Sequence, residues 1–266
     1  MLRSVAGRAL FEQRRAVLAW SLGTAAMVLV TVVYYPSVRD NPELNSFYES
    51  LPPAVQALSG GVGLDFASAS GYLTGELFAI TVPIIFIIYG VLLGAAAIGR
   101  EEERGTAELL LTAPVTRSRV VAEKAVAAAL LLAVVGAALF GSLVIGCALV
   151  DLEVSAGNLL ASSLASVLLG ITFGALALAI SGALGHRAHP AAWAGSLAVA
   201  AYILYSLAPV VSSLETWQKL SAFYWYLSSD PVSNGFDAGH LAVLAGAGVA
   251  LTALAALLFE RRDVAS

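Results

Sequence analysis

Residues 77–99 read LFAITVPIIFIIYGVLLGAAAIG, an apolar run without a single charged side chain. An α-helix rises about 1.5 Å per residue, so about 20 such residues cross the roughly 30 Å hydrocarbon core of a bilayer. The run ends at Arg100 and is followed by three glutamates, whose charges belong in water. This stretch therefore predicts a transmembrane helix that leaves the membrane near residue 100.

The rest of the chain has the composition of a membrane protein. Of its 266 residues, 59% are hydrophobic and only 12% are charged, whereas soluble domains carry about 25% charged residues. Comparable apolar runs recur, and the predicted spans are 16–35, 77–99, 125–150, 159–184, 190–214 and 241–259. We therefore predict an all-α polytopic membrane protein with six transmembrane helices in one transmembrane domain, residues 1–266. Pro83 and Pro209 are expected to kink their helices without ending them.

The basic residues orient these spans. Twelve of the 14 Lys and Arg residues fall in segments on one side of the membrane, and only Arg39 and Lys219 fall on the other. Because basic residues accumulate in cytoplasmic segments, both termini are predicted to be cytoplasmic. Residues 1–15 are predicted to form an interfacial helix, with a frayed basic tail as the alternative. The preference for Arg over Lys, with abundant Ala and Gly, favours a prokaryotic source and hence the cell inner (plasma) membrane.

The longest inner segment, 100–119, has the pattern of a short capped helix. A glycine allows a chain reversal, a threonine can cap the helix that follows, and an acidic residue in its first turn suits the helix dipole. An acidic approach and a leucine ridge would suit docking of a soluble partner; the alternative is that the leucines lie on the bilayer surface. The candidate docking residues are Glu101, Glu102, Glu103, Gly105, Thr106, Glu108 and Leu109.

The outer segment 215–240 is rich in aromatic side chains. The cluster Phe223, Tyr224, Trp225 and Tyr226 suits the membrane interface, where a ring body and a polar tip are both satisfied. One interpretation is an outer gate formed by a re-entrant segment, and the other is an ordinary aromatic belt in an interfacial segment. The residues alone favour neither.

Two weaker signals lie within or beside the spans. Gly90/Gly94 and Gly170/Gly174 have the G-x-x-x-G spacing of close helix packing, although such spacing arises easily by chance in a chain rich in Gly and Ala. Glu76 would be functional at membrane depth, but we expect it to be solvated at the outer interface.

Several functional classes are disfavoured. The lone Cys147 allows no intrachain disulfide and no cysteine-based metal site, and we predict no catalytic residue, no metal site and no bound nucleic acid. An intramembrane serine protease is disfavoured because Ser181 and His240 fall at opposite membrane faces. A secondary transporter usually needs charged residues near mid-membrane, which these spans lack; it and a membrane scaffold remain as alternatives. No G-x-x-x-x-G-K-[ST] motif occurs, so we expect no ATP site in this chain.

The inner segment also resembles a known family. The run EEERGTAELLLTAPVTRSRVVAEK, residues 101–124, is similar to the E-x-x-x-GT-x-E-x-L-L-x-x-P-V-S-R-like segment of ABC type-2 permeases, the membrane subunits of ABC exporters, and departs from it mainly by Thr116 where Ser is usual. Three further segments fit the same family: LPPAVQALSG (51–60), FYWYLSSDPVSNGFD (223–237) and FERRDV (259–264).

This resemblance implies a function and a set of partners. The segment between spans two and three would be a coupling helix that contacts a cytoplasmic ABC ATPase, present in two copies, and the outer aromatic segment would help to gate the exit. The chain would be the non-catalytic permease subunit of an exporter for an amphipathic or apolar substrate. It would pair in the bilayer with a second copy of itself or a paralogue, while ATP and Mg would bind to the partner subunit.

The charge asymmetry makes a topology prediction. Cysteines introduced at Ser4 or Ser118 should resist an impermeant thiol reagent in intact cells, while cysteines at Ser46 or Ser233 should be labelled. Labelling of position 118 from outside would contradict the six-span topology.

Overall fold

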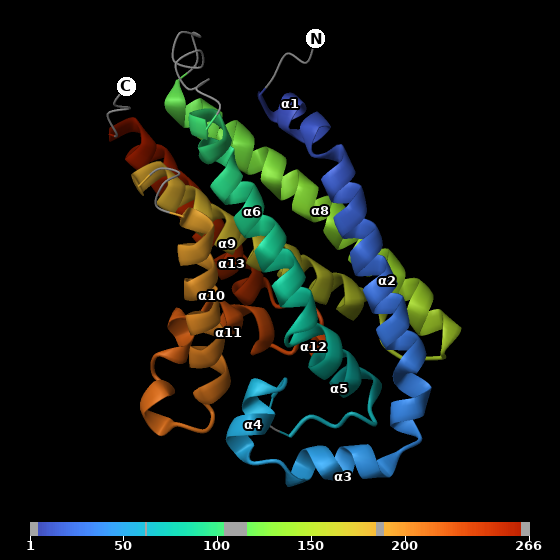
Figure 1. Cartoon of the computed structure of the whole chain (residues 1–266). Coiled ribbons are helices and arrows are strands. Elements are labelled where there is room, and N and C mark those ends of the chain that lie inside the picture. Colours follow the sequence, from blue (N-terminus) through green and yellow to red (C-terminus); the bar gives the residue numbers. More distant parts are fainter. Residues whose placement is uncertain (1–4, 62, 104–115, 185–188, 262–266) are drawn as a thin grey trace.

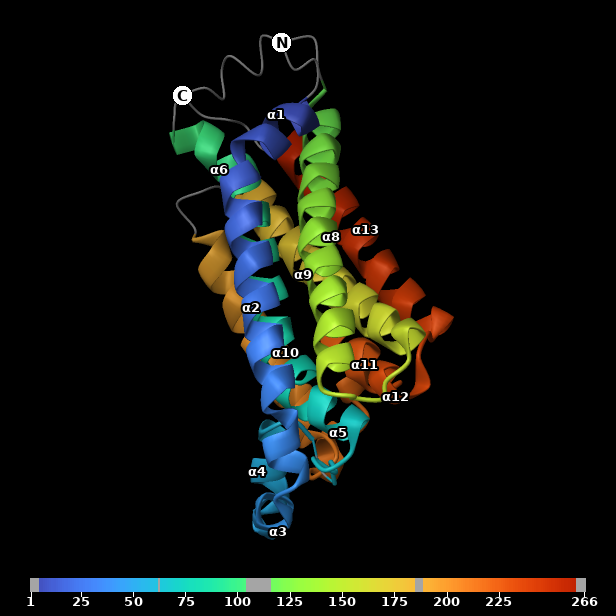
Figure 2. The same cartoon turned by 90° about the vertical axis from the view of Figure 1, so that its right-hand side faces the viewer.

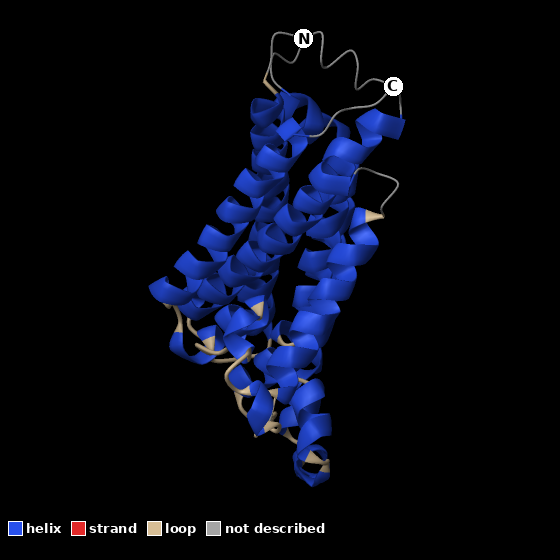
Figure 3. Ribbon diagram, turned by 90° about the vertical axis from the view of Figure 1, so that its left-hand side faces the viewer, coloured by secondary structure: helices blue, strands red, loops and turns tan. Residues whose placement is uncertain are grey.

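The structure, a computed structural model, describes residues 5–61, 63–103, 116–184 and 189–261. Helices and the loops between them make up this part of the chain, and it contains no β-strand (Figure 3). The predicted all-α class is therefore confirmed.

Consecutive long helices run in opposite directions along the bundle. The membrane-length helices and the short elements between them are α1 Val5–Glu12, α2 Arg14–Arg39, α3 Pro42–Ser50, α4 Pro53–Leu58, α5 Ala69–Leu73, the π-helix η1 Thr74–Phe78, α6 Thr81–Glu103, α8 Arg117–Leu149, α9 Ala156–Leu184, α10 Pro190–Leu207, the 3-10 turns η3 Ser212–Leu214 and η4 Gln218–Leu220, α11 Ala222–Leu227, α12 Pro231–Asn234 and α13 Ala238–Arg261. Figure 1 shows the long helices side by side, with α3 and α4 projecting at the end opposite α1.

The predicted number of spans is also confirmed. Within the described residues, six helical stretches are long and apolar enough to cross a membrane: Arg14–Arg39, Ala69–Ala97, Arg117–Leu149, Ala156–Leu184, Pro190–Leu207 and Ala238–Arg261. The protein is thus a polytopic membrane protein.

Pro83 and Pro209 do not kink their helices as expected. Helix α10 ends at Leu207, before Pro209, so the fifth helix is shorter than the predicted span to residue 214. Pro83 lies in the first turn of α6, where a missing backbone N–H costs little. The irregularity of the second span is instead the π-helix Thr74–Phe78, in which the Ala79 N–H donates to the Thr74 carbonyl.

Helices α6 and α9 pack closely enough that only glycine fits between them. A Cβ built on Gly90 would lie 2.2 Å from the Gly170 carbonyl oxygen, and one on Gly94 would lie 2.0 Å from the Gly174 carbonyl oxygen. Both distances are below any real contact, so the two G-x-x-x-G pairs face each other across one helix crossing. The glycine spacing that chance could explain in the sequence is therefore a structural feature.

The remaining long helices surround this pair. Helix α13 packs along α9, and α2 packs along α8 (Figure 2). Four buried hydroxyls of α9 are satisfied within the helix, because each donates to the carbonyl four residues earlier; they belong to Ser162, Ser163, Ser166 and Thr172. Such internal bonds satisfy polar groups in a setting without water.

A separate helix α1 precedes the first span, as predicted, and contacts α8 and α2. Leu10 packs against the core, while Phe11 is exposed and has the Arg14 guanidinium 3.9 Å from its ring centre. Leu10 and Phe11 therefore lie on different faces of α1.

The lobe predicted to face outward, residues 40–61 and 63–68, is held together by tyrosine hydroxyls. The Tyr48 hydroxyl lies 3.0 Å from the Gln56 carbonyl and 2.9 Å from the Gly61 carbonyl, and Tyr202 of α10 donates to the Leu58 carbonyl at 2.9 Å. Burial is the main cause that raises the pKa of Tyr48, so this phenol stays neutral. Glu76 is exposed on the surface of the fold, and its solvation at the outer interface stays a prediction.

The glycine crossing makes a stability prediction. Gly94→Ala should lower the free energy of unfolding by about 1–3 kcal/mol, the usual cost of overpacking, because the new methyl group meets backbone, which cannot rotate away. Gly141→Ala is the matched control, since a Cβ there would meet nothing within 4 Å. Melting in detergent should show a clear loss for Gly94→Ala and none for Gly141→Ala. Equal melting temperatures would show that the crossing is looser than described.

Candidate functional site

The end of the bundle that the sequence predicts to be cytoplasmic, termed the inner end, gathers four chain segments. Helix α1, the last turns of α6, the start of α8 and the end of α13 lie together at one end (Figure 1). Glu101, Glu102 and Glu103 form the last residues of α6, so the backbone of the predicted acidic approach is helical. Gly105, Thr106, Glu108 and Leu109 lie outside the described residues, and their assignment stays a prediction.

Helix α8 begins one residue after Thr116, at Arg117. Thr116 has the extended backbone of an N-cap residue, but its side chain makes no capping hydrogen bond. The helix therefore starts well before the predicted span at residue 125, and its first turns carry Arg117, Arg119 and Lys124. Arg119 pairs with Glu123 at 3.0 Å on the exposed side.

Arg117 and Lys124 reach across to neighbouring helices. Arg117 Nη1 donates to the Phe259 carbonyl of α13 at 3.2 Å, and Lys124 Nζ donates to the Ala97 carbonyl of α6. From the sequence, Arg117 and Lys124 were only two of the positive charges that orient the spans in the membrane. Their carbonyl partners are distant in the chain and carry no side-chain signal, so no pattern could have predicted the contacts.

The outer aromatic segment packs back against the bundle. Helix α11 contacts α9, α10 and α13. Phe223 and Tyr226 are buried, with 3% and 1% of their surface exposed, whereas Tyr224 and Trp225 are half-buried. The four predicted gate residues thus share one short helix, but two of them face the interior and two face its rim.

Tyr226 is anchored to α9. Ser166 Oγ donates to the Ser162 carbonyl and can therefore accept a hydrogen bond from the Tyr226 hydroxyl, which lies 3.2 Å away. Complete burial raises the pKa of Tyr226, so the phenol is a neutral donor. Asn158, at the outer start of α9, donates to the carbonyls of Val232 and Ser233 at 2.9 and 2.8 Å. The sequence singled out neither Ser166 nor Asn158, because polar residues in an apolar run reveal their partners only in the fold.

His240 joins α13 to α11. Its Nε2 lies 3.0 Å from Ser228 Oγ, and its Nδ1 lies 3.0 Å from Asp237 Oδ2. The His240 ring also packs against Trp225, with centroids 5.2 Å apart. A hydrogen bond from the His240 backbone N–H is the main cause that lowers the pKa of Asp237.

The order Ser228–His240–Asp237 is that of a hydrolase triad, but the surroundings favour a structural role. The Ser228 hydroxyl is also within bonding distance of the Tyr224 carbonyl, so its proton has another acceptor. The adjacent cavity has a volume of about 10 Å³, which holds no more than one water molecule. The cluster therefore fastens α11 to α13.

A groove lies between α2 and α6. It is lined by Ala19, Trp20, Gly23, Thr24 and Ile85 and has a volume of about 290 Å³. Its walls are apolar except for Thr24, whose buried hydroxyl has no hydrogen-bond partner among the described residues. Such a groove can accept an apolar body.

Comparison with known proteins agrees with these features. No match was found among curated proteins. The chain does match the family described as ABC-2 family transporter protein, over residues 11–264. This match takes in all six candidate spans, the inner segment and the outer aromatic segment. The chain therefore belongs to the ABC-2 transporter family as a multi-pass membrane protein.

Proposed function

We propose that the chain is the permease subunit of an ATP-driven exporter. It would move an amphipathic or apolar substrate out of the cytoplasm of a prokaryotic cell, across the plasma membrane, with its own termini inside. Energy would come from two copies of a separate cytoplasmic ABC ATPase, which bind ATP and Mg. A second copy of this chain, or a paralogue, would complete the membrane part of the complex.

The observation that carries this proposal is the family match across residues 11–264. The fold supports it, because α1, the end of α6, the start of α8 and the end of α13 lie together where a soluble ATPase could dock. The three glutamates that the sequence has at the end of α6 would be complemented by a basic partner.

The alternative is a six-span transporter or scaffold that uses no ATP. Secondary transporters usually hold charged residues or broken helices near the middle of the membrane. In the second span the helix is interrupted by the π-helix η1, but this break lies near the outer end of the span and not near its middle. Glu76, the charged residue in η1, is exposed. These features favour the ATP-driven permease.

The groove between α2 and α6 supports the proposed substrate class. Its apolar walls suit an acyl chain or a ring system. An ion or a free sugar would leave most of its polar groups unsatisfied against these walls.

The energy supply can be tested with purified protein. The chain alone should hydrolyse no ATP, because it has no phosphate-binding loop. A P-loop ATPase encoded in the neighbouring reading frame should co-purify with it and restore hydrolysis. Turnover by this chain in the absence of any second protein would remove the permease assignment.

The docking surface can be tested by charge. Reversal to Lys at Glu101, Glu102 and Glu103 should lower capture of the ATPase by about 10-fold or more, since juxtaposed like charges cost several kcal/mol. Gly105→Val should also lower substrate-stimulated hydrolysis if Gly105 has a positive φ.

The matched control is reversal at Glu43 and Glu49, which are exposed in α3 at the opposite end. That control should capture the ATPase as the unmodified protein does. If the variants at Glu101, Glu102, Glu103 and Gly105 insert correctly and still capture the ATPase and support hydrolysis as the unmodified protein does, segment 100–119 is only a solvated connector.

A further inference from the structure

At the start of α8, Arg117 binds the end of α13. Arg117 Nη1 donates to the Phe259 carbonyl at 3.2 Å, and the guanidinium lies 5.6 Å from the centre of the Phe259 ring. Phe259 is in the last turn of α13, whose carbonyls have no partner within the helix. A cation at this position is also favoured by the helix dipole. Arg117 therefore holds the inner end of α13 by both charge and stacking.

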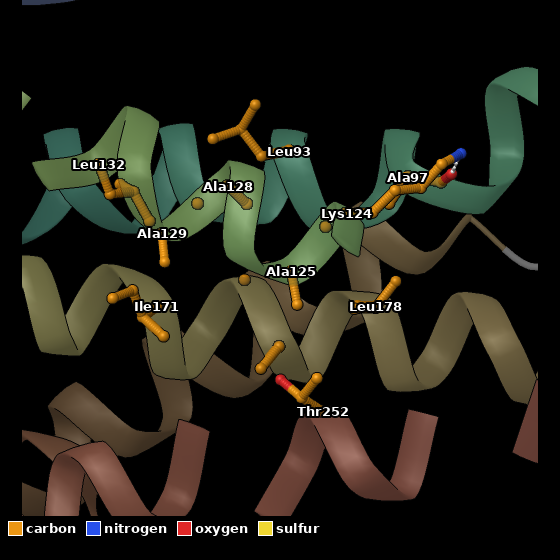
Figure 4. Close-up of a pocket in the computed structure, with 14 residues that line it drawn as sticks. Leu93, Ala97, Lys124, Ala125, Ala128, Ala129, Leu132, Ile171, Leu178 and Thr252 are labelled. Carbon is orange, nitrogen blue, oxygen red and sulfur yellow. Dashed lines mark hydrogen bonds between the residues drawn. The ribbon is translucent and has the colours of Figure 1, made fainter. Parts of the chain in front are cut away.

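Lys124 holds the other neighbour. It lies two turns after Arg117, hence on the same side of α8, and its ammonium donates to the Ala97 carbonyl of α6. Figure 4 shows this bond at the rim of a cavity between α6, α8, α9 and α13. The cavity has a volume of about 30 Å³ and is lined mainly by small apolar residues.

Helix α13 links the inner contact with Arg117 to the outer aromatic segment. It runs without a break from Ala238 to Arg261. At its outer end, His240 bonds Ser228 at 3.0 Å and packs on Trp225 and Tyr224, with centroids 5.2 and 6.0 Å apart. One straight element therefore touches the start of α8 at one end and α11 at the other.

We infer that α13 transmits movement from the ATPase-facing end to the outer aromatic segment, with Arg117 and His240 as the positioning residues at its two ends. This inference rests on the proposed function. A displacement of the segment before α8 would move Arg117, pull Phe259, and shift His240 against α11 as α13 moves as a rigid body. Lys124 would make α6 follow the same displacement.

The test measures the outer segment while the nucleotide state changes at the inner end. The complex with its ATPase is placed in lipid nanodiscs, with Cys147→Ala and a reporter Ser229→Cys in the turn after α11. The labelling rate by an impermeant maleimide is compared between nucleotide-free and vanadate-trapped complexes. The unmodified complex should show a change of about 5-fold or more, the lower range of allosteric coupling.

Removing the contact made by Arg117 or the one made by His240 should abolish this difference in labelling rate. Arg117→Leu and His240→Leu should each bring the ratio of the two rates close to one, normalised to the ATPase captured. Their double variant should be no worse than either alone, because both act on one route. Arg117→Lys, which keeps a donor for the Phe259 carbonyl, should recover part of the ratio. Arg119→Leu is the matched control, since Arg119 pairs with Glu123 and not with α13.

The outcomes separate the inference from the proposed function. An unmodified complex that captures no ATPase overturns the proposed function and this inference with it. One that captures the ATPase but shows no change on trapping overturns the inference alone. An unmodified complex that responds, together with variants that respond equally, overturns the inference alone. If Arg117→Leu does not insert, Arg117→Gln removes the charge with a polar side chain of similar length and decides the same point.

Discussion

The close contact between α6 and α9 is the constraint on which the rest of the structure depends. Gly90 and Gly94 of α6 lie directly against the carbonyls of Gly170 and Gly174 of α9. In a bilayer, helix association gains little from the hydrophobic effect and relies on such close backbone packing. Once these helices are locked together, α13 has α9 to pack on, α8 has both as neighbours, and α2 packs on α8.

This arrangement separates a fixed centre from adjustable ends. At the inner end, α8 reaches its neighbours through the long side chains of Arg117 and Lys124. At the outer end, α11 and α12 are held by polar bonds from Ser166 and Asn158 of α9 and by His240 of α13. Such contacts can be exchanged without breaking the glycine crossing, which suits a protein that must change shape while it keeps its fold.

Much of the fold could be predicted because the bilayer imposes simple rules. Charge-free runs predicted six spans, and six suitable helices are present among the described residues. Helix ends were harder: α8 continues through Arg117, Arg119 and Lys124, because a helix need not end where the membrane does. A kink was expected at Pro209, but α10 ends at Leu207, because proline has no backbone N–H to donate and its ring clashes with the carbonyl four residues earlier.

The candidate site was predictable only in outline. Acidic and aromatic clusters indicated which segments matter, but backbone carbonyls such as those of Phe259 and Ala97 leave no trace in a sequence. The two glycine pairs were visible, yet only the crossing of α6 and α9 shows that they face each other. The role of a glycine pair on one helix is therefore known only once the helix packed against it is known.

The most direct test of the permease assignment is a photo-cross-link from the end of α6. A benzophenone maleimide would be attached to Glu102→Cys in the Cys147→Ala background, in membranes that contain the ATPase. The account predicts an adduct with the ATPase from this position and none from Ser233→Cys at the opposite end. The absence of an adduct at position 102, or an equal adduct at position 233, would contradict it.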